Sequence, residues 1–582
     1  MRSDIPPAPR LLPDLLAALR EDLLRARYTV ERTEELLGEV AAGALRREDP
    51  VPARRALAPL TDPAAVSDPA AVNGPAAVNG PAAVLFALFT LGASVSEQLV
   101  AQALPSLGVE GARELGILTP AVPGGRDGRD SPDDPDSTAG GTVRALVDLA
   151  PYSAEDYRGQ ISWWIASDLS ELATGAALHP DHVLGVGGAS LTLARITPRE
   201  AVGRVLDVGC GSGIQALHAS RYAEHVIATD LSERALAFAA FNAALNQVEV
   251  ELRQGSLLDP VAGETFDLIV SNPPFVITPR GTAPRDSSDG EDGTSDGDRD
   301  KGEPEAWTYR DGGRAGDTLL AELLSALPAH LAPGGTAVML GNWERSGDEQ
   351  WDAHPRSWLA AAQAEGLDCW VIQRESEDPA QYAETWVRDG GITSRDPAWP
   401  EMIDAWLTDF DSRDVRGIGF GYVLLRRPPS AGASTADSQH SSGTDSSRPG
   451  TLRTEQVTGT GSGTLSAHLA AGLRMIDHLA RMDDEQLAAS RLHRASDLIE
   501  RRHLVPGAWD PSLIELVQGA GLARTVPADQ ALAATVGALD GTLTLGQTIA
   551  AVCALTDADP EQTRERLLPQ VRDLLITGML TL

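Results

Sequence analysis

The sequence predicts an α/β protein: a doubly wound, Rossmann-like seven-stranded sheet flanked by mainly helical, winged-helix-like N- and C-terminal domains. Two observations predict the sheet. From Gly203 to Leu425, short apolar runs alternate with stretches of helical length, and a glycine-rich turn follows the first run. Strands separated by helices pair in parallel, because each helix carries the chain back across a face of the sheet.

Seven apolar runs supply the predicted strands, and helical stretches separate most of them. The strands are expected at residues 204–208, 225–229, 248–252, 266–270, 336–340, 369–373 and 418–425. The helices are expected at residues 214–222, 232–246, 318–331 and 351–364. Ligands of open α/β sheets bind at the carboxyl ends of the strands, so candidate site residues are sought there.

The chain of 582 residues is too long for one hydrophobic core. Three stretches rich in Pro, Gly, Asp and Ser, at 123–141, 278–305 and 428–450, are predicted as linkers or insertions because they bury little apolar surface. A proline-rich repeat at 62–84 is predicted as a loop expansion. The expected domains are 1–150, the sheet domain 151–427 with a disordered insertion at about 278–305, a linker 428–450, and 451–582.

The N-terminal flank is predicted to be helical. Leu15, Leu19, Leu23 and Leu24 share one helical face. Helices at 84–91 and 97–103, followed by strand-like runs near 116–119 and 143–149, have the order of a winged-helix domain. Such a domain would bind DNA or serve as a packing or substrate-docking module, and no run of arginines marks its second helix.

The C-terminal flank is also predicted to be mostly helical. Leu469, Leu473, Ile476 and Leu479 define one helical face. Two further helices, at 548–554 and 561–576, resemble a helix-turn-helix. We therefore expect a second winged-helix-like module.

Composition excludes several classes of protein. The net charge of −35 disfavours binding of nucleic acid through a broad basic surface, although it leaves room for a local basic groove. The three cysteines lie far apart, which predicts neither a disulfide framework nor a zinc site, and we assign no metal. No leader is read, and the longest apolar stretch, near 82–95, is too short to cross a membrane. We expect a cytoplasmic protein.

A glycine loop follows the first predicted strand. Gly209, Gly211 and Gly213 stand between that strand and a helix, where the backbone must turn tightly and approach a ligand closely. A nicotinamide dinucleotide site would have its third glycine one residue later, where Ile214 stands. Cys210, within the loop, is predicted as a small residue and not as a nucleophile, because no cation adjoins it in sequence.

Asp230 follows the second predicted strand, about 20 residues after the loop. A carboxylate there can accept hydrogen bonds from both ribose hydroxyls of a nucleoside. The alternative is that Asp230 caps the next helix, but Ser232 is equally able to do so.

The order of Leu206-Asp207-Val208-Gly209-Cys210-Gly211-Ser212-Gly213, Asp230 and Asn272-Pro273-Pro274-Phe275 resembles the class I S-adenosylmethionine-dependent methyltransferases. The resemblance covers roughly Gly203 to Leu425. It implies S-adenosylmethionine as cofactor, with the three glycines along its methionine part and Asp207 near its amino group. It further implies that Asp230 holds the ribose and that Ser256 and Leu257 flank the adenine.

The segment Asn272-Pro273-Pro274-Phe275 is the predicted catalytic signature. Two prolines fix φ and leave rigid carbonyls at the carboxyl edge of the sheet. If the Asn272 side-chain oxygen and the Pro273 carbonyl accept the protons of a planar NH2 group, its nitrogen gains electron density and points at the sulfonium methyl. Phe275 can stack on the planar target. The alternative is a simple turn after a strand.

The signature resembles those of methyltransferases acting on release-factor glutamine, on adenine in DNA or RNA, and on guanine in ribosomal RNA. Gly312, Gly313 and Gly316 follow the acidic insertion as in the glutamine enzymes, and the net acidity favours a protein over a polyanion. We expect a macromolecular substrate, with a release factor favoured over RNA or DNA. A small-molecule acceptor is a further alternative. Another is a winged-helix regulator with an inactive methyltransferase fold, against which intact Asp230 and Asn272 argue.

Two further features lie before the glycine loop. Trp163 and Trp164 are predicted to pack in the core, with a place at the substrate entrance as the alternative. The glycine-containing segment 182–193 would cover the cofactor from its N-terminal side.

Overall fold

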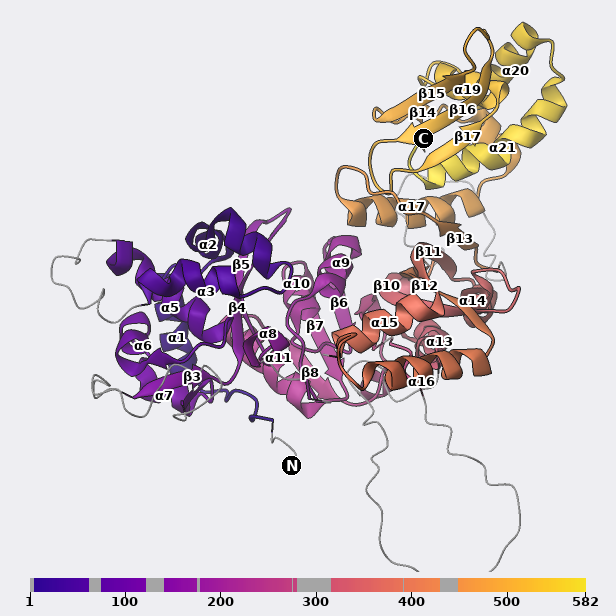
Figure 1. Cartoon of the computed structure of the whole chain (residues 1–582). Coiled ribbons are helices and arrows are strands. Elements are labelled where there is room, and N and C mark those ends of the chain that lie inside the picture. Colours follow the sequence, from indigo (N-terminus) through magenta and orange to yellow (C-terminus); the bar gives the residue numbers. More distant parts are fainter. Residues whose placement is uncertain are drawn as a thin grey trace, which may run out of the picture.

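The computed structural model describes residues 5–61, 75–121, 141–174, 178–179, 181–274, 276–279, 316–390, 392–429 and 449–582. Phe275, Gly312 and Gly313, together with most of the three predicted linkers and insertions, lie outside these residues. Figure 1 shows an N-terminal helical module, a central sheet domain and a C-terminal module following one another along the molecule.

The central sheet contains eight strands in the described part of the chain, in the order β13-β11-β12-β10-β9-β6-β7-β8. The prediction of seven strands is therefore one short. The strands are β6 (Val202–Val208), β7 (Ala223–Asp230), β8 (Glu251–Gln254), β9 (Phe266–Ser271), β10 (Leu331–Ser346), β11 (Asp368–Glu377), β12 (Val415–Arg426) and β13 (Leu452–Gln456). The expectation of an entirely parallel sheet is also wrong, because β12 runs antiparallel to both β10 and β11.

The strand order explains where a ligand can bind. From β6 the chain continues to β7 and β8 on one side, and then crosses back to pair β9 with the other side of β6. The loops that follow β6 and β9 therefore leave the sheet in opposite directions. In open α/β sheets this point of reversal opens a crevice at the carboxyl ends of the strands.

Helices cover both faces of the sheet, and alternate strand residues point to opposite cores. Val205 packs in one core and Leu206 in the other. The first face is covered by α9 (Gly188–Ile196), α10 (Ile214–Ala219) and α17 (Leu465–Ala480), and the second by α13 (Thr318–Ala326) and α14 (Ala353–Ala364). The predicted alternation of strands and helices thus produces the Rossmann-like fold.

The sheet domain continues past residue 451, where the C-terminal domain was expected to begin. Strand β13 pairs in parallel with β11, with Cys369 opposite Leu452, and so covers an edge that would otherwise stay unpaired. Helix α17 is amphipathic as predicted, but Leu469 and Leu473 pack into the core of the central domain. In Figure 1 this helix lies between the sheet and the C-terminal module.

A buried ion pair joins the C-terminal module to the edge strand. The Arg524 side chain, only 5% exposed, binds both carboxylate oxygens of Glu455 on β13 at 2.7 and 3.0 Å. The indole nitrogen of Trp370 donates to the same carboxylate at 2.9 Å. Truncating one member would leave a buried charge without its partner, so this contact holds the module against the sheet.

The N-terminal module consists of helices around a small sheet. The helices are α1 (Pro13–Arg25), α2 (Val30–Leu45), α3 (Val51–Leu57), α5 (Pro75–Phe89), α6 (Glu97–Ala103) and α7 (Gly108–Glu114). The strands β1 (Val95–Ser96), β3 (Thr142–Ala145) and β2 (Leu118–Pro120) pair in the order β1-β3-β2. The elements follow the predicted order, and the winged-helix assignment itself stays a prediction.

Two details of the N-terminal prediction are wrong. Leu24 is 56% exposed, and the buried face of α1 is instead formed by Leu16, Leu19 and Leu23. The repeat is not a loop throughout, because α5 begins at Pro75 and includes the Pro-Ala-Ala-Val segments of its last two copies. Alanine is a strong helix former, and Ala82 and Ala83 are buried in the module's core.

A hairpin of β4 (Asp148–Asp156) and β5 (Gly159–Ser167) connects the first module to the central domain, so the predicted boundary at 150/151 falls inside a strand. Two buried asparagines bind the backbone of β5. Asn242 lies within α11 (Glu233–Leu245), and Asn246 caps the C-terminal end of that helix. Asn242 accepts from Ala166 N at 2.7 Å and donates to Ala166 O at 2.9 Å, while Asn246 contacts Trp164 in the same way. These side chains act as a partner strand would.

Replacing Asn242 by Ala should destabilise the chain by about 3 kcal/mol, because it leaves buried backbone groups of Ala166 and Ser212 without partners. The midpoint of urea unfolding measures the effect. Glu233→Ala, at an exposed position of the same helix, should change the free energy of unfolding by no more than about 0.5 kcal/mol. Equal midpoints for the two variants would contradict this role of Asn242.

The C-terminal module was predicted to be mostly helical. It instead combines helices with a three-stranded antiparallel sheet in the order β15-β16-β17. Its elements are α18 (Asp484–Ala489), β14 (His493–Arg494), β15 (Leu498–Leu504), β16 (Pro511–Gln518), β17 (Thr525–Ala528), α19 (Gln530–Ala538), α20 (Leu545–Thr556), α21 (Pro560–Ile576) and β18 (Leu580–Thr581). No strand was predicted for β15, whose central residues are charged and exposed, or for β16, although alternate residues of β16 are buried. Helices α20 and α21 match the predicted pair.

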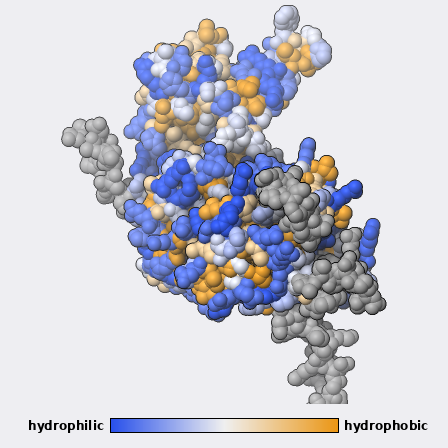
Figure 2. All heavy atoms as spheres, turned by 90° about the vertical axis from the view of Figure 1, so that its left-hand side faces the viewer, coloured by the Kyte–Doolittle hydropathy of each residue, from blue (hydrophilic) through white to orange (hydrophobic). Residues whose placement is uncertain are grey.

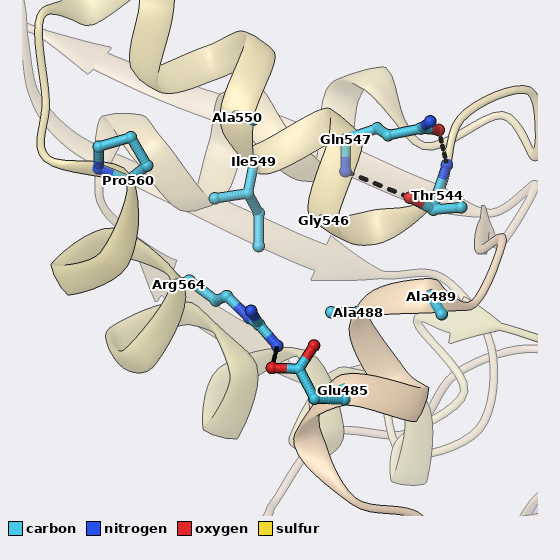
Figure 3. A pocket seen from close by; sticks show the side chains of 10 residues that line it. All are labelled: Glu485, Ala488, Ala489, Thr544, Gly546, Gln547, Ile549, Ala550, Pro560 and Arg564. Carbon is cyan, nitrogen blue, oxygen red and sulfur yellow. Dashed lines mark hydrogen bonds and ion pairs between the residues drawn. The ribbon is translucent and has the colours of Figure 1, made fainter.

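An open cavity of about 390 Å³ lies between α18, α20 and α21. Ala488, Ile549 and Ala550 form its apolar wall, and an ion pair of 2.7 Å between Arg564 and Glu485 lies at its rim (Figure 3). All of its lining residues belong to the C-terminal module, away from the carboxyl edge of the central sheet.

Among the helices that the structure describes, none has the length and apolar character needed to cross a membrane.

Candidate cofactor and acceptor site

The glycine loop connects β6 to α10 as predicted. Gly209, Gly211 and Gly213 have φ of 70°, 54° and 86°, a region that side-chain-bearing residues rarely adopt. A Cβ atom at Gly209 or Gly211 would meet nothing within 4 Å, whereas one at Gly213 would lie 3.1 Å from Ala239 of α11. The first two glycines therefore face open space that a ligand can enter, and the third allows the helix to pack closely.

Asp207 lies beneath the loop and is only 1% exposed. One of its carboxylate oxygens accepts a hydrogen bond from Ala216 N, in the first turn of α10, at 3.0 Å. Burial, opposed by the hydrogen bond from Ala216 N and assisted by the nearby Asp230 carboxylate, raises the pKa of Asp207 to about 7. A cation placed beside this carboxyl group would favour its ionised form.

Asp230 ends β7 and is fastened to the glycine loop. Its two carboxylate oxygens accept hydrogen bonds from Gly211 N at 2.9 Å and Ser232 N at 2.8 Å. Ser232 caps α11 by accepting from Ala235 N, as predicted, although Asp230 also takes part in that turn. Burial raises the pKa of Asp230 above its usual range. Each oxygen retains lone-pair capacity for a further donor such as a ribose hydroxyl.

Ser256 and Leu257 lie in the turn after β8, beside the end of β7. Gly255 N donates to the Asp230 carbonyl at 3.0 Å, and Thr229 Oγ1 donates to the Leu257 carbonyl at 3.4 Å. Leu257 itself has a φ of 48°. The structure therefore brings this turn to the same edge as Asp230 and the glycine loop, and its contact with adenine stays a prediction.

Asn272 follows β9 at the neighbouring strand end. Its side-chain oxygen is buried and has no hydrogen-bond partner among the described residues. Leaving a buried acceptor unpaired costs about 1–3 kcal/mol, so the site suits a ligand that donates an N–H group. Pro273 is buried and Pro274 is half-buried, whereas Phe275 lies outside the described residues, so its predicted stacking role stays a prediction.

The glycine loop and the loop that begins at Asn272, named the acceptor loop after its predicted role, start from strand ends that are joined directly. Val208 on β6 is paired with Ser271 on β9, and Ser271 Oγ donates to the Val208 carbonyl at 2.8 Å. Ser271 was not among the predicted site residues, although its position between the apolar run of β9 and Asn272 places it at the same strand end. All seven predicted cofactor-binding residues and Asn272 thus lie at the adjoining ends of β6, β7, β8 and β9 or in the turns that follow them.

Other predicted features have a structural role. Trp163 and Trp164 are buried, and the Trp164 indole donates to the Tyr28 carbonyl at 2.7 Å, so packing is the correct interpretation. The Cys210 thiol is buried, and burial raises its pKa well above the usual range, which agrees with its interpretation as a small residue. Residues 182–193 contact α10, where Gln215 Nε2 donates to the Ser190 carbonyl at 2.7 Å, and the predicted place of this segment over the cofactor stays a prediction.

Asn242 is a further site residue that sequence analysis missed. Besides binding β5, it donates to the Ser212 carbonyl of the glycine loop at 2.9 Å. Two asparagines four residues apart within an otherwise apolar helix were the available signal, since buried amides require partners. Asn242 thereby links the glycine loop to β5 of the hairpin that leads from the N-terminal module.

Two family models match parts of the chain. Residues 185–282 match the methyltransferase small domain, and residues 25–128 match a domain of unknown function (DUF7059). The first match contains the glycine loop, Asp230 and Asn272.

Curated relatives match over the central part. The chain is 35% identical over 168 residues to the release factor glutamine methyltransferase of Xylella fastidiosa, covering 28% of this chain and 56% of that protein. It is 32% identical over 176 residues to the ribosomal protein uL3 glutamine methyltransferase of Bradyrhizobium diazoefficiens, covering 29% and 51%. The chain therefore spans about half the length of these relatives.

Solved structures give a weaker likeness. The ribosomal protein L11 methylase from Lactobacillus delbrueckii has a TM-score of 0.22 at 18% identity, covering 42% of this chain and 81% of that one. A methyltransferase from Pyrococcus furiosus has a TM-score of 0.23 at 16% identity, covering 41% and 81%. The assignment of the fold stands instead on the strand order and the family model. The central part of the chain is a class I S-adenosylmethionine-dependent methyltransferase domain that resembles the release-factor glutamine methyltransferases.

Proposed function

We propose that this chain transfers a methyl group from S-adenosylmethionine to the side-chain amide nitrogen of a glutamine in a protein. One observation carries the proposal: the Asn272 oxygen is buried, has no hydrogen-bond partner in the described part of the chain, and stands directly after β9, which pairs with β6. A primary amide offers two N–H donors, and the Asn272 oxygen is an acceptor in need of one.

The residues of this chain would act by positioning. S-adenosylmethionine, when bound, supplies an electrophilic methyl group. Asp230, the glycine loop and Asp207 would hold this cofactor. The Asn272 oxygen and the Pro273 carbonyl would accept hydrogen bonds from the two amide N–H groups, which favours electron density on the nitrogen and fixes its direction. Such preorganised acceptors stabilise the charge that develops on the nitrogen during transfer, so no separate base has to act first.

The choice of glutamine is supported by the relatives and by charge. Two of the relatives are named for glutamine methylation, one of a release factor and one of a ribosomal protein. The net charge of −35 opposes a polyanionic substrate. The surface in Figure 2 shows hydrophilic side chains interspersed with small apolar patches. We propose the flanking modules as docking elements for the protein substrate.

Transfer of label from methyl-labelled S-adenosylmethionine tests the proposal. The full chain is incubated with purified bacterial release factor, and in parallel with ribosomal protein, RNA and DNA fractions. Label on glutamine of a protein is the expected result. Label on adenine or guanine would replace glutamine by an exocyclic amine, and cofactor binding without transfer to any fraction would favour a regulator.

Affinity for S-adenosylmethionine should rise with pH up to about pH 7. The neutral form of Asp207 predominates below its pKa of about 7, and the ammonium group of the cofactor favours the ionised form. The dissociation constant should therefore fall by at most about tenfold per pH unit below pH 7 and then level off. The stability of the cofactor-free protein should depend on pH in the opposite direction. Because burial raises the pKa of Asp207, its contribution to the free energy of unfolding is lost as pH rises through about 7.

Asp207→Asn is the control for this pH dependence, because an amide stays neutral at every pH. The raised pKa of Asp230 adds a second titration, which the Asn variant retains. Calorimetric titration between pH 5.5 and 8.5, both limits being chosen to bracket about pH 7, compares the two proteins. Identical pH profiles would contradict a pairing of Asp207 with the cofactor's amino group.

A further inference from the structure

Hydrogen bonds to other elements fix the chain just before and just after the acceptor loop. Before it, Ser271 is bonded to Val208. After it, Ile277 N donates to the Tyr382 hydroxyl at 3.0 Å. Pro273 and Pro274 have no N–H group, so they cannot anchor the loop by donating to the protein. The contact with Tyr382 therefore fixes the backbone at Ile277, five residues after Asn272.

Tyr382 belongs to a helical unit inserted between β11 and β12. It lies on α15 (Pro379–Asp389), which packs against α16 (Trp399–Ser412). The ring is fully buried, with Trp406, Phe410 and Phe420 at centroid distances of 5.7–5.8 Å. Contacts on several sides leave the ring little freedom to shift.

The hydroxyl of Tyr382 accepts a second hydrogen bond, from Asn342 Nδ2 at 2.9 Å. Asn342 is 1% exposed and extends from β10, the strand beside β9. Burial raises the pKa of the Tyr382 hydroxyl, so the group stays neutral. One oxygen thus joins the sheet, the inserted helices and the backbone after the acceptor loop.

We propose that Tyr382 is a positioning residue for methyl transfer, which sets the place of the acceptor loop through the N–H group of Ile277. This inference rests on the proposed function, in which Asn272 holds the acceptor nitrogen. Tyr382 acts through the loop and contacts neither acceptor nor cofactor. The inserted helices α15 and α16 thereby become part of the machinery that aligns the acceptor with the methyl group.

Tyr382→Phe tests the inference, because it keeps the packed ring and removes only the hydroxyl. We expect kcat for methylation of release factor to fall at least about tenfold, since small displacements of an aligned group lower rates strongly. The dissociation constant for S-adenosylmethionine should not change. Tyr222→Phe is the matched control: its side chain is also buried, but it lies just before β7 begins, at the opposite edge of the sheet.

Hydrogen exchange supplies a readout that does not depend on the acceptor. Exchange of the amides at 276–279 should accelerate in Tyr382→Phe and stay unchanged in Tyr222→Phe. Faster exchange throughout the central domain would indicate general destabilisation and overturn the inference. Unchanged exchange at Ile277 would overturn it as well.

The failure of the inference can be told apart from that of the proposed function. If Asn272→Ala is inactive while Tyr382→Phe equals the wild type in kcat, only the role of Tyr382 fails. If the wild type does not methylate release factor, the proposed substrate fails, and the exchange experiment still decides on the anchor. A fall in kcat with unchanged cofactor affinity supports both.

Discussion

Replacing Asn272 by Ala should lower kcat for methyl transfer about 1,000-fold, equivalent to about 4 kcal/mol of transition-state stabilisation. The substitution removes the buried oxygen that would receive an amide proton, and the remaining Pro273 carbonyl cannot orient the nitrogen alone. Because Asn272 lies one residue beyond the pairing of Ser271 with Val208, the cofactor strand itself is left intact. The affinity for S-adenosylmethionine should therefore stay within about twofold of the wild-type value.

The same variant should not lose stability, which is unusual for a change at a half-buried position. Among the residues that the structure describes, the Asn272 oxygen has no hydrogen-bond partner, so its removal relieves a desolvation cost of about 1–3 kcal/mol. We expect a urea midpoint equal to or above that of the wild type. Asn272→Asp, which keeps an acceptor oxygen, should retain more activity than Asn272→Ala. Wild-type turnover by the Ala variant would show that the oxygen does not hold the acceptor.

The elements nearest the site could be predicted because each has a local cause. A buried apolar run such as Leu268 to Val270 has few alternatives to a central strand, and glycines at 209, 211 and 213 supply the positive φ that the loop needs. Strand order then follows from helical crossovers. The joint location of the glycine loop, Asp230 and Asn272 could thus be predicted from sequence.

The features that were missed depend on partners distant in sequence. Strand β13 forms only because the edge of β11 is free, and nothing local in residues 452–456 shows this. Tyr382 obtains its role from Ile277, which is 105 residues away. A local signal did mark the start of α15, where Asp378, Pro379 and Gln381 form a capping box with proline in the first turn. That signal predicts a helix but not what the helix holds.

Asp230→Ala should weaken binding of S-adenosylmethionine at least about 100-fold, or about 3 kcal/mol. The Ala side chain loses both acceptors proposed for the ribose hydroxyls. It also removes the acceptor of the hydrogen bond from Gly211 N, which is 2.9 Å long in the wild type, so the glycine loop is less firmly held. Both losses act on binding, and calorimetric titration of the full chain measures their sum.

Asp267→Ala separates this effect from the general cost of deleting a carboxylate that accepts a backbone hydrogen bond. Asp267 accepts from Arg204 N at 2.8 Å, but it stands near the amino end of β9, at the edge opposite the glycine loop. The two variants should lose similar stability, whereas only Asp230→Ala should lose affinity for the cofactor. Equal affinities would mean that the nucleoside is held elsewhere. At saturating cofactor, Asp230→Ala should recover much of its turnover, because Asp230 acts on cofactor binding. Asn272→Ala should not recover, because Asn272 acts on the acceptor nitrogen.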